Sequence, residues 1–460
     1  MSEQKEQFLI DSERIAFDEN HRKIIDFNIS RYDNAVLKGK KQYLDIELAK
    51  GRAARIKRNV VNDLESYLKE FESNFQKNGG KLIWAIDAQE AVKAVLDIAQ
   101  KHHVKKVVKS KSMVTEEIEL NKHLEAFGVE SLETDLGEYI VQVAGERPYH
   151  IVTPAMHKSK EDVAKLYHEK FNTPEEYTPE ELTYYTRLKL REKFTKADMG
   201  ITGGNFLIAD AGALALTENE GNGVLTMSMP KIHVAIVGIE KLIPSIKDLD
   251  LFWSLLSTYG TGQKITVYNS IISGPKRPEE TDGPEHMYLI LLDNGRTNLL
   301  EKKDQKLALS CIRCGACLNV CPVYKTIGGH AYETTYSGPI GAVITPHMRG
   351  FEEYSHLSFA SSLCGKCTET CPVNIPLHDM LLYNRRDAVK AGHTEKGFNL
   401  VMKAYKIAMG KRWIIETFSP SIKNIGVGLT FKKSWGPRRE LPKFTESFTQ
   451  RWKKERKYLS

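Results

Sequence analysis

The chain has 460 residues, of which 41% are hydrophobic and 27% charged, so its composition is that of an ordinary globular protein. A chain of this length buries a large core and needs no disulfide framework, which leaves its seven cysteines to be explained by another role. The formal net charge of +7 is concentrated after residue 400, where 15 Lys and Arg stand against 4 Asp and Glu.

The first 78 residues are expected to form helices. Apolar residues recur at helical spacing at Val60, Leu64, Leu68 and Phe71, and two glycines at 79–80 end the pattern. The first residues are charged and lack the apolar region of a secretory signal, and no apolar run has the length of a membrane-spanning helix. We therefore expect a cytoplasmic protein whose thiols stay reduced.

Strands alternate with helices from residue 79 to about residue 298. The expected helices lie at 88–102, 115–127 and, in an acidic stretch, about 159–198. The expected strands lie at 81–86, 105–108 and 139–143, and in a glycine-punctuated block at 200–292. Such alternation predicts a mostly parallel sheet that is covered by helices on both faces.

All seven cysteines lie between residues 311 and 371, in two motifs that each end in proline. The first is CIRCGACLNVCP at 311–322, with the spacing C-x2-C-x2-C-x3-C-P, and the second is CGKCTETCP at 364–372. The first spacing is that of bacterial proteins with two [4Fe–4S] clusters. Closely spaced thiolates bind three corners of a cubane, and the cysteine before the proline reaches the other cluster.

This exchange of the fourth cysteine predicts the ligands of both clusters. The first cluster is expected to bind Cys311, Cys314, Cys317 and Cys371. The second is expected to bind Cys321, Cys364 and Cys367.

The second cluster then lacks one thiolate, because Ser361 stands where the full motif would have cysteine. Three interpretations remain open. Ser361 or a water molecule completes a [4Fe–4S] cluster, the cluster is of the [3Fe–4S] type, or another side chain such as His356 is the ligand.

Other roles for the cysteines fit the spacing poorly. Structural zinc sites use four ligands per ion in other patterns, and an odd number of cysteines argues against a set of disulfides. The chain shows neither a G-x-G-x-x-G motif after a strand nor a P-loop, so no nicotinamide, flavin or nucleotide site is evident. We therefore expect a carrier of single electrons that exchanges them with partner subunits.

The basic C-terminal region includes the pair Arg438–Arg439 and a cluster of Lys453, Lys454, Arg456 and Lys457. It is either a solvated tail or a docking surface for an acidic partner subunit or an anionic membrane, through which the protein would associate with the respiratory chain. No nucleic-acid reading motif is present, so nucleic acid is not an expected partner.

Three features together resemble one family. They are KSKSMVTEE at 109–117, GITGGNFLIADAGALALTENE at 200–220 and the dicluster motif. The sequence resembles the lactate utilization protein B family over nearly its whole length. The resemblance implies an α/β LUD domain, similar to ribose-phosphate isomerases and CoA-transferases, followed by an α-helical dicluster ferredoxin-like domain. It also implies that the seven cysteines are the cluster ligands and that Ser361 belongs to the family pattern.

The implied function is electron transfer in the oxidation of L-lactate to pyruvate, together with the other components of the lactate utilization system, which allows growth on lactate. The chain would be the electron carrier of this oxidoreductase complex. The implied domains are a helical extension at 1–78, the LUD domain at 79–298, the dicluster domain at 299–392 and the basic extension at 393–460.

Two alternative functions remain open. The chain serves another 2-hydroxy acid such as glycolate, or it is a LUD enzyme that processes CoA or sugar phosphates and has structural clusters. In the second case Glu218 is the candidate nucleophile, because a Glu in a similar Glu-Asn-Gly setting has this role in CoA-transferases. Gly203, Gly204 and Asn205 are candidates for an anion pocket, and Lys109 and Lys111 follow a strand where an anion would bind.

Overall fold

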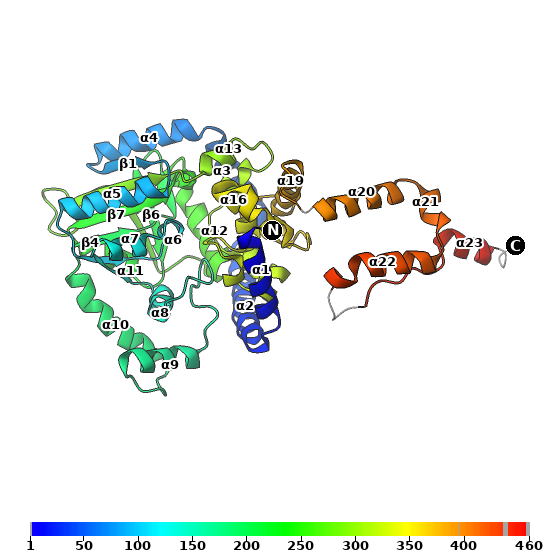
Figure 1. The fold of residues 1–460 in the computed structure, drawn as a ribbon. Coiled ribbons are helices and arrows are strands. Elements are labelled where there is room, and N and C mark those ends of the chain that lie inside the picture. Colours follow the sequence, from blue (N-terminus) through cyan, green and yellow to red (C-terminus); the bar gives the residue numbers. More distant parts are fainter. Residues whose placement is uncertain (1, 395, 436–439, 457–460) are drawn as a thin grey trace. The chain divides into compact units, whose positions relative to one another are not determined.

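The computed structural model describes residues 2–394, 396–435 and 440–456. The chain forms two compact units, Met1–Ala388 and Val389–Ser460. The first unit holds the N-terminal helices and the sheets (Figure 1). It also contains all seven cysteines.

A six-stranded parallel sheet with the strand order β1-β10-β7-β4-β2-β3 lies in the first unit. Its strands are β1 (Lys81–Ala85), β2 (Lys106–Lys109), β3 (Glu130–Glu133), β4 (Met199–Thr202), β7 (Ile232–Gly238) and β10 (His286–Leu292). The neighbouring strands β7 and β10 read IHVAIVG and HMYLILL, and nearly all of their side chains are buried. Continuous apolar runs are typical of parallel strands that are covered on both faces. The predicted parallel sheet is confirmed.

Helices pack on both faces of this sheet (Figure 1). On one face lie α5 (Ala88–Lys101) and α7 (Leu120–Ala126), whose Val95 and Leu124 are fully buried against the strands. On the other face, Phe71 and Phe75 of α4 (Leu64–Lys77) pack in one core with side chains of β7 and β10. These amphipathic helices thus bury the apolar side chains of the strands from both sides.

A second sheet follows within the glycine-rich block, with the order β8-β5-β6-β9. Its strands are β5 (Phe206–Ile208), β6 (Ala213–Glu218), β8 (Leu242–Ile243) and β9 (Tyr268–Ile272). Strands β5 and β6 form an antiparallel hairpin, and β9 adds to β6 in antiparallel fashion. The predicted strand-rich block therefore divides between two sheets.

The strand predicted at 139–143 is wrong, because these residues lie in the helix α8 (Leu136–Ala144). The Asp135 side chain caps the helix by accepting a hydrogen bond from the Glu138 N–H (3.2 Å), and Gly145 ends it with a φ of 71°. A mostly apolar run of five residues fits a strand or a helix equally well, and here the flanking cap residues decide for the helix.

The helix predicted at 115–127 is interrupted. It consists of α6 (Met113–Glu117) and α7, and between them Glu119 takes a left-handed φ of 50°. The acidic helices predicted at 159–198 are confirmed as α9 (Lys160–Phe171) and α10 (Pro179–Thr195), each of which begins with a capping box.

The N-terminal helices pack against the cysteine-bearing region. They are α1 (Glu3–Ala16), α2 (Glu19–Gly39) and α3 (Ile46–Asn62). The Phe8 ring of α1 meets the Tyr332 ring edge-on at 6.0 Å, and Lys50 of α3 donates to the Glu369 carbonyl at 3.1 Å. The helical extension thus shares one hydrophobic core with the cysteine region.

The cysteine region is built from short helices and 3-10 turns. After α13 (Arg296–Leu300), they are η4 (Lys306–Ser310), α14 (Ala316–Asn319), α15 (Pro322–Ile327), η5 (His330–Tyr332), α16 (Gly338–Arg349), α17 (Phe351–Tyr354), η6 (Ser355–Phe359), α18 (Lys366–Glu369) and α19 (Leu377–Lys390). Most of the cysteines are buried within the core of this region.

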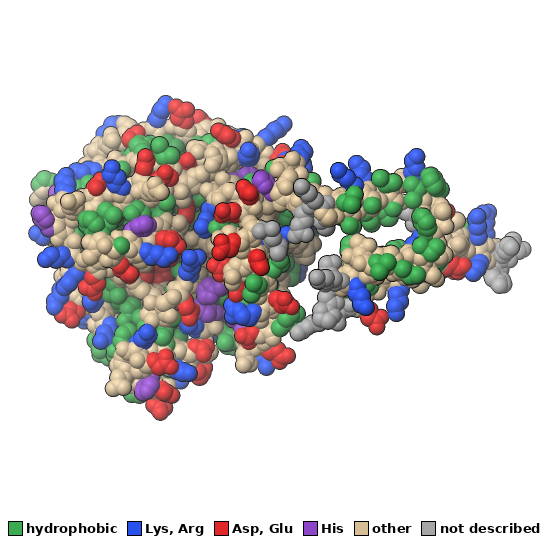
Figure 2. All heavy atoms as spheres, in the orientation of Figure 1, with side chains coloured by type: hydrophobic (Ala, Val, Ile, Leu, Met, Phe, Trp, Pro, Cys, Tyr) green, Lys and Arg blue, Asp and Glu red, His purple; other side chains and the backbone are tan. Residues whose placement is uncertain are grey.

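The second unit is helical in its described part. Its helices are α20 (Lys396–Gly410), α21 (Arg412–Thr417), α22 (Pro420–Trp435) and α23 (Phe448–Arg456). Large hydrophobic side chains such as Leu429 and Trp413 are exposed, and Figure 2 shows hydrophobic side chains along α20 and α22 with Lys and Arg beside them. The predicted basic residues Arg438, Arg439 and Lys457 lie outside the described residues. Within the described ranges, no helix combines the length and the hydropathy that crossing a bilayer requires.

Candidate iron–sulfur site

The cysteines gather in two groups, and each group draws on both motifs. In the first, here called the inner group, the thiols of Cys314, Cys317 and Cys371 have raised pKa values because burial disfavours the thiolate. The nearby thiol of Cys311 raises all three further. Cys371 comes from the second motif, and because it also raises the pKa of Cys314 and Cys317 it lies near the leading cysteines of the first.

The second group, here called the outer group, contains Cys321, Cys364 and Cys367. Burial raises the pKa of the Cys367 thiol to about 11, and the thiols of Cys321 and Cys364 raise it further. Cys364 is exposed, and the Lys366 N–H holds the pKa of its thiol below the usual value. The inner group is thus mostly buried, whereas the outer group reaches the surface.

The backbone turns in the same way around both motifs. Arg313 and Gly315, on either side of Cys314, have φ values of 60° and 77°. Leu363 and Gly365, on either side of Cys364, have φ values of 54° and 80°. A left-handed conformation is unfavourable for Arg and Leu, so its occurrence at matching positions indicates that the two cysteine loops have the same backbone conformation.

Backbone N–H groups point at the ligand atoms of these loops. The Arg313 N–H donates to Cys311 Sγ at 3.4 Å, and the Ile375 N–H donates to Cys371 Sγ at 3.4 Å. In the second motif the Leu363 N–H donates to Ser361 Oγ at 3.1 Å. The Ser361 hydroxyl therefore has the backbone setting that Cys311 Sγ has in the first motif.

The donor set suits iron–sulfur clusters. Buried thiols that raise one another's pKa resist ionisation together, and iron provides the positive charge that stabilises them as thiolates. The N–H donors to sulfur and the left-handed turns are those of a loop that closes around a bound group.

Comparison with known proteins agrees with this donor set. A LUD domain model matches residues 68–292, and a 4Fe-4S dicluster domain model matches residues 307–375. Lactate utilization protein B of Bacillus thuringiensis (strain Al Hakam) is 43% identical over 413 residues, which cover 87% of each chain. Lactate utilization protein B of Bacillus cereus (strain B4264) is 43% identical over 414 residues, 88% of this chain and 87% of its own.

The chain belongs to the lactate utilization protein B family. Among solved structures, a DUF162 family protein from Deinococcus radiodurans overlaps with 50% of this chain and 98% of its own. It has 12% sequence identity and a TM-score of 0.29, an overlap too loose to establish a common fold.

In this family member, a buried ionic network joins the LUD domain to the cysteine region. Arg296 Nε lies 2.5 Å from Glu240 Oε2, and Arg296 Nη2 lies 2.9 Å from Glu117 Oε2. The Tyr336 hydroxyl donates to the same Glu117 oxygen at 2.6 Å, and Arg313 Nη2 lies 3.4 Å from Glu240 Oε1. Arg313 and Tyr336 belong to the cysteine region, so the network holds its inner loop against the LUD domain.

Cations surround the inner group. Lys57 of α3 is buried and donates to the carbonyls of Glu240 and Leu242 at 2.7 and 2.9 Å, and burial lowers its pKa to about 7. Burial also lowers the pKa of Lys241, to about 8. Together with Arg313, these cations would offset the negative charge of a bound cluster.

The sequence analysis missed Lys57, Arg313 and Lys241. Arg313 occupies an unspecified position of the C-x2-C motif, although a charged side chain between two cysteines of the motif is a signal. Lys241 ends the short 3-10 turn Ile239–Lys241 that follows β7, and a buried lysine there is unusual.

The Glu218 carboxylate is held by hydrogen bonds and is not free to act as a nucleophile. Its two carboxylate oxygens accept hydrogen bonds from the N–H groups of Gly223 (2.6 Å) and Val224 (2.8 Å). Its pKa is raised, chiefly by burial. Both oxygens are therefore engaged in fixing the turn after β6.

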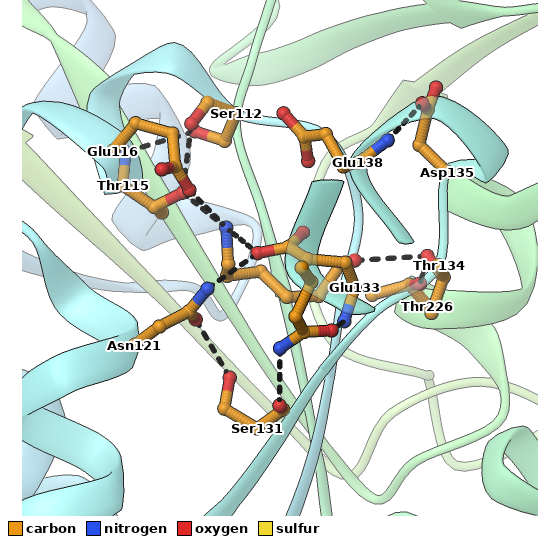
Figure 3. Close-up of polar contacts among 12 residues, drawn as sticks. Ser112, Thr115, Glu116, Asn121, Ser131, Glu133, Thr134, Asp135, Glu138 and Thr226 are labelled. Carbon is orange, nitrogen blue, oxygen red and sulfur yellow. Dashed lines mark hydrogen bonds and ion pairs between the residues drawn. The ribbon is translucent and has the colours of Figure 1, made fainter. Parts of the chain in front are cut away.

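Lys109 is not free to bind an anion, contrary to the prediction from the sequence. It is fully buried, and its Nζ lies 2.6 Å from Glu133 and 3.2 Å from Glu116. Thr115 and Glu116 of α6 and Glu133 of β3 all contact the Lys109 ammonium, and Figure 3 shows these three side chains close together. Lys109 is thus a structural cation, whereas Lys111 donates to Asp135 and to the Val152 carbonyl.

Proposed function

We propose that this protein carries two iron–sulfur clusters and transfers single electrons in the oxidation of L-lactate to pyruvate. The observation that carries the proposal is the sorting of the cysteines into two groups, each drawn from both motifs. Membership in a family whose named relatives are lactate utilization proteins supports the substrate. Growth on lactate is the expected physiological outcome.

In this proposal the inner cluster is a [4Fe–4S] cluster bound by Cys311, Cys314, Cys317 and Cys371. The outer cluster is bound by Cys321, Cys364 and Cys367, with Ser361 Oγ or a water molecule at its fourth iron. The backbone hydrogen bond to Ser361 Oγ supports the serine over a [3Fe–4S] cluster, because it holds the oxygen in the setting of a ligand sulfur.

His356 has less support as the fourth ligand. Its Nδ1 lies 2.8 Å from the Glu353 carbonyl oxygen, and its ring packs against Phe8 at 5.2 Å. Contacts with α1 and α17 therefore already fix the orientation of the His356 ring.

The clusters, once bound, supply one-electron chemistry, and the protein's own residues determine where this chemistry can be reached. Burial of Cys314, Cys317 and Cys371 excludes water from the inner group. The exposure of Cys364 gives a partner subunit access to the outer group. We infer that electrons pass between the inner group and a partner that docks beside Cys364.

The partners are proposed to be the other components of a lactate utilization system in the cytoplasm. The excess of Lys and Arg after residue 400 and the exposed apolar side chains of the second unit suit docking to an acidic subunit or to an anionic membrane surface.

The decisive experiment is an anaerobic purification of the full chain, with iron and sulfide analysis and EPR. About eight irons per chain indicate two cubanes, and about seven indicate one cubane and one three-iron cluster. Colourless protein without iron would overturn the proposal. Growth of a deletion strain on lactate and on glycolate distinguishes the two substrates.

A further inference from the structure

A cavity of about 530 Å³ lies in the LUD domain at the carboxyl ends of the parallel strands. Ser110 follows β2, Asp135 follows β3, Gly203 follows β4 and Lys241 follows β7, and all four line the cavity. Small ligands of open α/β sheets bind at this edge, and cavities of this size hold small molecules.

Two buried cations with unused hydrogen-bond donors line this cavity. The Arg313 side chain is 9% exposed, and only its Nη2 reaches a carboxylate; its Nε and Nη1 have no hydrogen-bond partner in the described part of the chain. The Lys241 ammonium makes no hydrogen bond or ion pair among the same residues, although Lys241 is only 7% exposed. Buried donors are almost always satisfied, so the unpartnered Nε and Nη1 of Arg313 point to an anion that binds beside them, where the Lys241 ammonium also lines the cavity.

A second part of the lining is acidic. Glu220 Oε2 accepts a hydrogen bond from the Leu136 N–H at 3.0 Å, and burial together with the charge of Asp135 raises the pKa of Glu220 to about 7. Lys111 and Glu218 bring the lining to three cations and three acids. A polyphosphate would be repelled by the acids, whereas a monoanion with a hydroxyl group would meet both kinds of partner.

The cavity shares a wall with the inner cysteine loop. Arg313 lies between Cys311 and Cys314 in the chain. The Arg313 side chain of the inner loop lines the cavity itself. Gly260 of α12 (Leu249–Thr261) also lines it, and a Cβ atom added there would lie 3.4 Å from the Cys314 carbonyl oxygen. The inner loop therefore forms part of the cavity wall.

We propose that this cavity binds the monoanion of a small 2-hydroxy or 2-oxo acid, with its carboxylate on Arg313 and Lys241, against the inner cysteine loop. The ligand class rests on the proposed role in lactate oxidation. The acidic side of the cavity receives the hydroxyl group of the ligand. Because the anion binds next to the inner cluster, its binding and the charge state of that cluster influence each other reciprocally.

The test is calorimetric titration of the full-length protein, with its iron content verified, against L-lactate, pyruvate and inorganic phosphate. We expect saturable binding of L-lactate or pyruvate that Lys241→Met weakens at least about tenfold, the loss of one charged hydrogen-bond partner. Lys93→Met, on the exposed side of α5, is the matched control and should bind as the unmodified protein does. The iron content should be the same for all three proteins.

Three results would overturn the inference. The first is no saturable binding of either acid to protein with a full iron content, which leaves electron transfer intact. The second is phosphate binding more tightly than both acids. The third is obtained with Arg313→Lys. If this variant alters the cluster spectrum but leaves the ligand affinity unchanged, the guanidinium interacts with the cluster and the proposed carboxylate site is wrong. Protein without iron would instead contradict the proposed electron transfer.

Discussion

Ser361 Oγ and Cys311 Sγ accept hydrogen bonds from equivalent backbone N–H groups, each two residues further along its loop. The two loops also share left-handed residues at matching positions. The second motif therefore keeps the fold of a four-cysteine loop although it has only three cysteines in all.

Replacement of this serine by cysteine should complete the outer ligand set. In Ser361→Cys, a thiolate replaces the serine oxygen and should change the EPR signal of the outer cluster. If the native chain binds fewer than about eight irons, the variant should bind about eight. Ser362→Cys is the matched control, because it adds a thiol one position away. An outer signal that is unchanged in Ser361→Cys would show that residue 361 does not reach the cluster.

The exchange of the fourth cysteine predicts a crossed pattern of losses. Cys371→Ser should remove the inner cluster although Cys371 lies in the second motif, and Cys321→Ser should remove the outer cluster although it lies in the first. Anaerobic iron analysis and EPR of both variants check this. If each substitution instead removed the cluster of its own motif, the proposed ligand assignment would fail.

The buried network around Arg296 should contribute strongly to stability. Arg296→Met leaves Glu117 and Glu240 without their main partner, and such a loss typically costs about 3–5 kcal/mol in the free energy of unfolding. A clear fall of the urea midpoint is the expected result. Arg386→Met is the control, because Arg386 is 42% exposed and its surface pair with Asp304 should contribute little to stability. Equal effects would contradict the role of the buried network.

His233 should make stability depend on pH. It is fully buried in β7 beside Thr202, and burial lowers its pKa to about 4. In the unfolded chain His233 has a pKa of about 6.5, so between about pH 4 and 6.5 the unfolded chain binds more protons than the folded one. The contribution of His233 to folding stability is therefore complete above pH ~6.5 and is lost as the pH falls through 4. The lowered pKa corresponds to roughly 3 kcal/mol.

Urea midpoints measured from pH 7 down to 4.5 check this prediction. The native chain should lose stability along this range, and His233→Gln should lose less of it. His123→Gln, at an exposed position of α7, should follow the native chain. Parallel curves for the native chain and His233→Gln would show that another group is responsible.

Part of this molecule could be predicted from local patterns. The continuous apolar runs of β7 and β10 indicate buried parallel strands, and residue spacing alone indicated iron–sulfur motifs at 311–322 and 364–372. The apolar run of α8 was misjudged because five residues do not distinguish the two periodicities; its cap at Asp135 was the overlooked signal.

The sequence by itself predicted the iron–sulfur motifs, the parallel sheet and the family, since these depend on residue types and spacings within short stretches. Only the tertiary structure decided that Arg313 lies in a cavity of the LUD domain, that Glu240 and Arg296 join this domain to the inner loop, and that Ser361 is oriented like Cys311. These relationships come from contacts between residues far apart in the chain. Such contacts form when the whole core packs, and no local pattern encodes them.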